Sequence, residues 1–238
     1  MDTYKNAHKW LLIPFAIAII GFLPSYYLQF ANAKFGHHIH GLSATFWYAI
    51  VIYQPYLIRK KEIQKHKKYG VLGVFLAGMV VASGLAMIPG NISGAMAQEA
   101  SGQLSQIAPP FFLYGVSLFD FVAIAGFGVS VIIAIKKSRN VDDHALWMIS
   151  TVFWALMPAL ARMALIPLVF LDNITHFANM AMLTTPLIIL SLVVVMFRVK
   201  KAHPALIAAG IANLLSFVII PLGKADWWIS FVQTFFKS

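Results

Sequence analysis

Residues 110–135 read PFFLYGVSLFDFVAIAGFGVSVIIAI, and this stretch carries one charged side chain, that of Asp120. A helix of about 20 apolar residues crosses the hydrocarbon core of a bilayer. The stretch is therefore predicted to be a transmembrane helix. An acidic side chain inside such a helix is costly, so Asp120 is the first candidate for a role beyond packing.

The whole chain has the composition of a membrane protein. Of its 238 residues, 60% are hydrophobic and 11% are charged, and the mean hydropathy is +0.79. A soluble domain carries about 25% charged residues. We expect an all-α, polytopic membrane helix bundle in which residues 1–238 form a single transmembrane domain. Cysteine is absent, so any metal has to be bound by His, Asp, Glu, Met or Tyr.

Apolar runs separated by turn signals and charges predict seven transmembrane helices. Their expected ranges are 10–30, 39–58, 69–89, 110–135, 145–171, 174–197 and 205–222. The outer loop 91–109 contains Asn91-Ile92-Ser93, a glycosylation sequon if the host is eukaryotic.

The loop charges predict the orientation, because Lys and Arg are retained on the cytoplasmic side. Fourteen Lys and Arg residues fall on one side of the predicted helices, three fall on the other, and Arg162 lies within a span. We expect the N-terminus inside and the C-terminus outside. The net charge of +10 lies largely in short loops, which favours anionic lipid headgroups of the bilayer over nucleic acid as a partner.

Asp120 and Arg162 are predicted to form a buried charge pair. Counted at the rise of an α-helix, they lie about 22 Å and about 26 Å from the cytoplasmic ends of their helices. Both are therefore in the outer third of consecutive antiparallel helices. Two interpretations stay open: the pair only joins the helices, or it also faces a cavity that binds a ligand.

Histidines provide candidate ligands for haem or a metal ion, because neutral imidazole binds both. An outer group of histidines shares the level of the charge pair, and an inner group lies at the cytoplasmic ends of helices. The outer histidines are His37, His40 and His176, and the inner ones are His66, His144 and His203. Supporting residues on the same helix faces are Trp47, Gln54, Trp154 and Asn179.

Several short motifs resemble an uncharacterised family of bacterial multi-helix membrane proteins. They are His40-Gly41, Trp47, Gln54, Leu57, the run His66-Lys67-Lys68-Tyr69-Gly70, Asp120 with His144, Met148, Ala159 and Ala161-Arg162, and the late His203-Pro204 with a terminal Trp. The His-bearing helices of that family are loosely similar to transmembrane b-type cytochromes with two haems. The resemblance implies a bacterial inner (cytoplasmic) membrane and leaves open whether the protein is an enzyme.

Three functions follow from these residues. In the first, haem b or a metal ion held by His40 with His176, or by His66 with His144, transfers electrons between a quinone and a partner. In the second, a proton-coupled carrier or receptor takes a small anionic ligand into an outer cavity, with Asp120 exchanging the proton. In the third, the polar residues only hold the helices of a structural subunit together.

Overall fold

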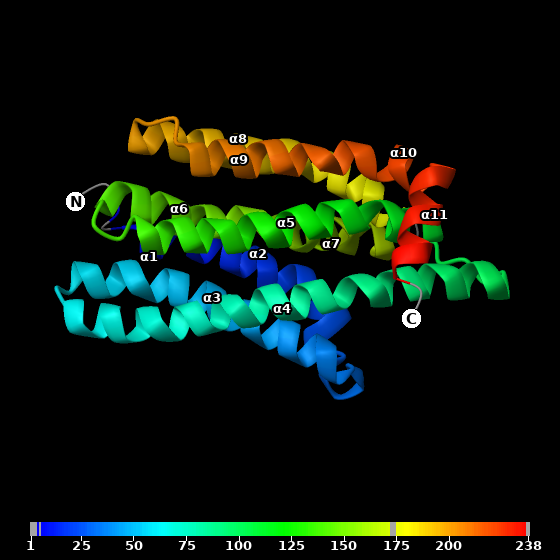
Figure 1. The fold of residues 1–238 in the computed structure, drawn as a ribbon, viewed down its shortest axis with the longest axis horizontal. Helices are drawn as coiled ribbons and strands as arrows, with labels where there is room; N and C mark the ends of the chain where they lie inside the picture. The colour runs from blue at the N-terminus through cyan, green and yellow to red at the C-terminus, as the bar shows by residue number, and fades with distance from the viewer. Residues whose placement is uncertain (1–3, 5, 172–174, 237–238) are drawn as a thin grey trace.

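The computed structural model describes residue 4, residues 6–171 and residues 175–236, which form helices and no strand. The long helices run along one axis in antiparallel succession (Figure 1). In chain order the α-helices are α1 (Ala7–Trp10), α2 (Leu12–Phe22), α3 (Phe35–Arg59), α4 (Ile63–Ser101), α5 (Pro110–Lys136), α6 (Val141–Trp154), α7 (Leu156–Phe170), α8 (Phe177–Val199), α9 (Pro204–Asn213), α10 (Ile219–Gly223) and α11 (Asp226–Phe235). Shorter helical turns cover Leu23–Tyr27, Phe30–Asn32 and Leu214–Val218. Lys5 and Lys237, two of the counted cations, and Ile174, the first residue of the predicted sixth span, lie outside the described residues.

Five helical segments of the described chain are long and apolar enough to cross a membrane, and a bent pair brings the number to six. The five are Ala7–Tyr27, Ile63–Ser101, Pro110–Lys136, Phe177–Val199 and Pro204–Gly223, and the pair is α6 with α7. The predicted seven spans are therefore supported only as five to six. The predicted span without this support is α3. It is long enough to cross a membrane, but it carries three histidines and Gln54 and is not apolar enough to count as a candidate span.

Helix α4 is longer than the predicted third span. It continues through Pro89 to Ser101 and ends at Gly102, whose φ of 68° is the left-handed conformation that glycine adopts readily. Pro89 removes one backbone hydrogen bond, yet Ile92 and Ala95 beyond it are fully buried. This burial stabilises the helix past the proline, so part of the predicted outer loop is helical.

The predicted fifth span is broken into α6 and α7, which meet at a 41° bend at Ala155. Pro158 has no N–H to donate to the carbonyl of Trp154, four residues earlier. The missing bond explains the break. As a result His144 and Arg162, five turns apart in sequence, do not lie on one continuous helix face.

The basic loops gather at one end of the bundle. The turns α3–α4, α5–α6 and α8–α9 lie at the same end as the described N-terminal residues, and α11 lies at the opposite end (Figure 1). These turns carry Arg59, Lys60, Lys61, Lys136, Lys137, Arg139, Lys200 and Lys201. The charge asymmetry read from the sequence is thus also an asymmetry of the folded molecule.

Small residues allow the closest helix contacts. A Cβ atom added to Gly223 on α10 would collide with the carbonyl oxygen of Phe111, and one added to Gly115 on α5 would collide with that of Ile219. These two glycines let α5 and α10 approach at backbone distance, as is common in membrane proteins.

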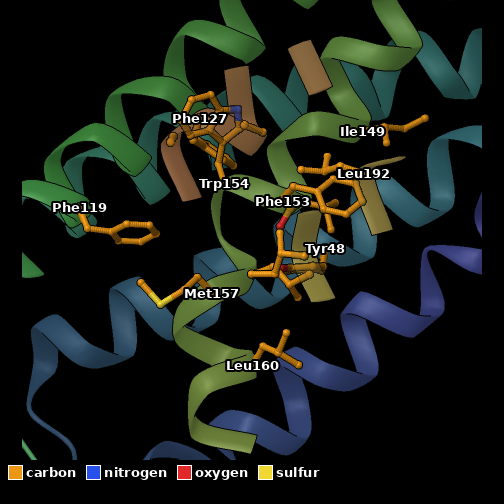
Figure 2. Packing of buried hydrophobic residues seen from close by; sticks show 14 of the residues in the cluster. Tyr48, Phe119, Phe127, Ile149, Phe153, Trp154, Met157, Leu160 and Leu192 are labelled. Carbon is orange, nitrogen blue, oxygen red and sulfur yellow. The ribbon is translucent and has the colours of Figure 1, made fainter. Parts of the chain in front are cut away.

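The main hydrophobic core lies where α3, α5, α6, α7 and α8 meet (Figure 2). Its labelled members include Tyr48, Phe127, Phe153, Met157 and Leu192. A smaller cluster of Ile92, Ala95, Tyr114 and Val232 joins the outer part of α4 to α5 and α11. The bundle therefore holds one long core and one separate outer core.

Candidate functional site

A partly enclosed cavity of about 260 Å³ lies between α4, α5, α7 and α8. Its walls contain two oppositely charged residues and one amide among apolar side chains. The lining residues are Asn91, Ala108, Phe112, Leu113, Val116, Asp120, Met157, Pro158, Ala161, Arg162, Phe177 and Ala181. The volume is just below the range of roughly 300–1,000 Å³ that is typical of small-molecule pockets.

The guanidinium of Arg162 is fixed in the cavity wall. Its Cζ lies over two phenyl rings, 4.7 Å from the ring centroid of Phe22 and 4.8 Å from that of Phe177. Its Nη1 donates a hydrogen bond to the carbonyl oxygen of Pro158 at 2.9 Å. The Nε atom is buried and has no hydrogen-bond partner. One donor of this cation is therefore unsatisfied.

Asp120 lines the same cavity but does not close onto Arg162. The Nδ2 atom of Asn91 donates to its Oδ2 at 3.5 Å. Within the described part of the chain, no ion pair within 4.0 Å joins Asp120 to Arg162, although the two charges interact. Asp120 and Arg162 were predicted to lie at a similar depth, and they line one cavity. They do not form the predicted direct pair.

Asn91 was assigned to a glycosylation sequon, and its position in the structure does not suit that modification. It lies within helix α4, its side chain faces Asp120, and the following Ile92 is fully buried. Acceptor asparagines lie in accessible loops. Asn91 is a wall residue of the cavity, which sequence reasoning missed.

The outer histidines are not gathered into one group. His40 on α3 has its Nδ1 3.1 Å from Ser83 Oγ on α4. His37 is exposed on the same helix. The predicted partner of His40, His176, packs instead against the ring of Phe111, with centroids 5.0 Å apart.

His176 caps a helix. Its Nδ1 accepts a hydrogen bond from the backbone N–H of Asn179 at 3.3 Å at the start of α8. Burial lowers the pKa of His176, which favours this neutral, accepting form. Asn179 itself is exposed and lines a shallow apolar depression with Met182 and Phe217. This capping hydrogen bond gives His176 a structural role that requires no bound cofactor.

At the inner end the structure brings His66 and His144 together. Their ring centroids are 6.3 Å apart in an edge-to-face arrangement. The Nδ1 of His144 lies 2.8 Å from the carbonyl oxygen of Ala134, to which it donates. The Nδ1 of His66 and the Oε1 of Gln54 are buried without hydrogen-bond partners. This pairing agrees with one of the predicted histidine pairs.

His203 belongs to a different inner contact. Its Nε2 donates to Asp143 Oδ1 at 3.2 Å, and its Nδ1 accepts from the N–H of Ala205, which caps α9. Asp143 also pairs with Lys137 and Lys201 at 3.4 Å and 3.3 Å. Burial lowers the pKa of His203, outweighing the opposite effect of Asp143. Asp143 thus joins the α5–α6 turn to the α8–α9 turn.

The supporting tryptophans belong to the core. The Nε1 of Trp47 donates to Thr151 Oγ1 at 3.1 Å, which joins α3 to α6. Trp154 fills the space that Gly126 leaves open on α5. In the described residues no three His, Asp or Glu side chains are grouped so that they could hold a metal ion. The haem and redox interpretation therefore gains no support from the geometry.

The fold and the spanning helices define the chain as a multi-pass integral membrane protein. Residues 18–119 match the family described as Transmembrane 6 superfamily member 2-like, transmembrane domain. The rat (Rattus norvegicus) protein Transmembrane 6 superfamily member 2 is 36% identical over 74 residues, which are 31% of this chain and 18% of the relative. The chain thus spans less than a fifth of the length of that relative. No solved structure matches the chain.

These similarities correct the family suggested by the short motifs. The expected resemblance to bacterial membrane proteins and b-type di-haem cytochromes is wrong, because the matches lie in a eukaryotic transmembrane family. The bacterial origin inferred with it is contradicted, and the bacterial inner membrane loses its support. The matched segment ends at residue 119, one residue before Asp120, so the central charges of the cavity lie outside it.

Proposed function

We propose that the protein is a carrier or receptor that binds a small anionic amphiphile in the cavity between α4, α5, α7 and α8. The observation that carries this proposal is the guanidinium of Arg162, which lies in the cavity wall with its Nε unsatisfied. A buried donor without an acceptor costs about 1–3 kcal/mol. An oxygen-bearing ligand that reaches this Nε would remove the cost by accepting its hydrogen bond.

The two aromatic rings support binding at a defined point. Phe22 and Phe177 both pack against the guanidinium, so little side-chain freedom is lost when a ligand binds. A desolvated contact between a cation and an aromatic ring contributes about 2 kcal/mol. The charged group is therefore already oriented before the ligand arrives.

The remaining wall supports an amphiphilic ligand. Phe112, Leu113, Val116 and Met157 provide apolar surface, which suits a short hydrocarbon body. A carboxylate head would accept from Arg162 and lie beside Asp120. Two carboxylates at one site favour uptake of one proton, which makes Asp120 the group that would couple proton and ligand.

The separation of the two charges argues against a purely structural pair. A pair that only joins helices is most stable when carboxylate and guanidinium form direct hydrogen bonds. Here Arg162 instead donates to the carbonyl of Pro158, and Asp120 faces Asn91. Both residues nevertheless line the same cavity, as a ligand site requires.

We also infer that α3 crosses the membrane as a seventh span, with the N-terminus in the cytoplasm. Its 25 residues correspond to about 37 Å of helix, and it runs beside α4 (Figure 1). The collected basic turns support the cytoplasmic side. In intact cells, a Cys introduced at Ser101 should react with an impermeant reagent and one at Gln64 should not. The reverse result would overturn the orientation.

A ligand panel tests the binding proposal. Octanoate, octanol and octylamine share a chain length and differ in the charge of the head. Octanoate should raise the melting temperature of the purified protein most, and Arg162→Gln should abolish this shift. Arg139→Gln, which removes an exposed cytoplasmic charge, is the matched control and should keep it. Equal shifts for all three compounds, or an unchanged shift in Arg162→Gln, would refute the proposal.

A further inference from the structure

The last helix, α11, lies across the end of the bundle. In Figure 1 it is the red helix that runs transverse to the bundle axis, opposite the basic turns. It begins at Asp226, three residues after the last spanning segment ends at Gly223. α11 is therefore the element that directly follows the last spanning segment.

Contacts on one face fix α11 to the protein. Val232 packs with Ile92, Ala95 and Tyr114 in the outer core. The Nε1 of Trp228 donates to the backbone oxygen of Tyr114 at 2.9 Å, and the Nε2 of Gln233 donates to its hydroxyl at 2.8 Å. This face of α11 is therefore packed against the protein.

The part of α11 that faces away from the bundle has two chemically distinct stripes. Trp227, Phe231 and Phe235, spaced by four residues, are 68%, 54% and 70% exposed. Residues at this spacing lie on one helix face. The second stripe is exposed and polar. Its members each precede one of these aromatic residues in the sequence, and they are Asp226, Ser230 and Thr234. Large aromatics on one exposed stripe beside a polar stripe are typical of a helix at a membrane surface.

The distance between α11 and the basic end of the bundle agrees with a position of α11 at the opposite membrane surface. Tyr114, which holds α11, is about 33 Å along α5 from Lys136, and Ile92 is about 36 Å along α4 from Lys68. The hydrocarbon core of a bilayer is about 30 Å thick. The basic residues and α11 are thus separated by about one bilayer core.

We propose that α11 lies flat in the outer bilayer interface, with Trp227, Phe231 and Phe235 inserted among lipid chains and Asp226, Ser230 and Thr234 facing water. The occupant of its exposed aromatic stripe is the lipid surface of the membrane that the bundle already spans. This inference does not depend on the ligand proposed for the cavity.

Spin labelling tests the position directly, because the chain contains no cysteine. Single nitroxide labels are placed at Phe231→Cys and Phe235→Cys, and matched labels at Ser230→Cys and Thr234→Cys. The protein is reconstituted in phosphatidylcholine vesicles. Collision rates are measured with oxygen, which concentrates in lipid, and with a Ni(II) chelate, which stays in water.

Labels at 231 and 235 should collide more with oxygen, and labels at 230 and 234 should collide more with the Ni(II) chelate. The preference is thus expected to reverse between neighbouring positions. High Ni(II) collision rates at all four sites would overturn the proposal, because the helix would stand in water. Protection of 231 and 235 from both reagents would also overturn it, because a protein partner or a second copy would cover the stripe.

Discussion

Arg162 and Asp120 are the residues on which the proposed function depends. Asp120→Asn removes the negative charge nearest to the guanidinium, so the free energy of unfolding should fall by about 1–3 kcal/mol. This loss is smaller than the roughly 3–5 kcal/mol found when a directly paired buried charge is removed, because the two groups are not in contact. Thermal unfolding in detergent measures it.

The double variant Asp120→Asn with Arg162→Gln is the control for this prediction. Removing both charges should cost less than the sum of the single changes, because the cavity then holds no isolated charge. Strictly additive losses would show that the two residues do not interact across the cavity.

His203 makes the stability of the folded protein depend on pH. Its folded-state pKa is lowered mainly by burial, so the unfolded chain binds a proton more readily. The contribution of His203 to the free energy of unfolding is complete above its ordinary pKa of about 6.5. It is lost as the pH falls through the lower pKa of the folded state. Protonation also removes the Nδ1 acceptor that caps α9.

His203→Asn should flatten this dependence while keeping a residue that caps helices well. Melting temperatures of wild type and variant, compared between about pH 7 and about pH 5, should converge at low pH. A constant difference over the range would contradict the assignment of the titration to His203.

At the scale of elements, α5 and α10 depend on glycine at their contact. Gly223→Ala would place a Cβ against the carbonyl of Phe111, and overpacking of this kind costs about 1–3 kcal/mol. Gly78→Ala on α4 is the matched change, because nothing lies within 4 Å of the added atom. Thermal unfolding should show a lower melting temperature for the first variant alone. Equal effects would contradict the close approach of these helices.

The elements also show what the sequence predicts well and where it fails. Long apolar runs predict helices because each buried backbone group must be satisfied within its own segment. The length of α4 was not predictable from Pro89, because its extension depends on burial of Ile92 by distant residues. The break at Ala155 was visible in principle from Pro158, since proline removes one helical bond.

For the whole molecule, the sequence predicted that Asp120 and Arg162 lie at a similar depth, but it did not predict which side chains surround them. Asp120 and Arg162 stood out because charges in a span are costly, and both do line one cavity. Their neighbours Phe22, Asn91 and Phe177 come from three other helices. No local pattern brings those side chains to Arg162, because tertiary packing decides it. For the same reason His40 and His176 were paired on depth alone.

The most direct test of the binding account is the location of a bound probe. An octanoate analogue carrying a photoreactive diazirine is added to the purified protein, irradiated, and its attachment sites are mapped by peptide mass spectrometry. If the ligand occupies the cavity, attachment is expected at Phe112, Met157 or Phe177, and it should be lost in Arg162→Gln and kept in Arg139→Gln. Attachment only to exposed side chains of α8 such as Leu187 and Leu190, or an unchanged pattern in Arg162→Gln, would contradict it.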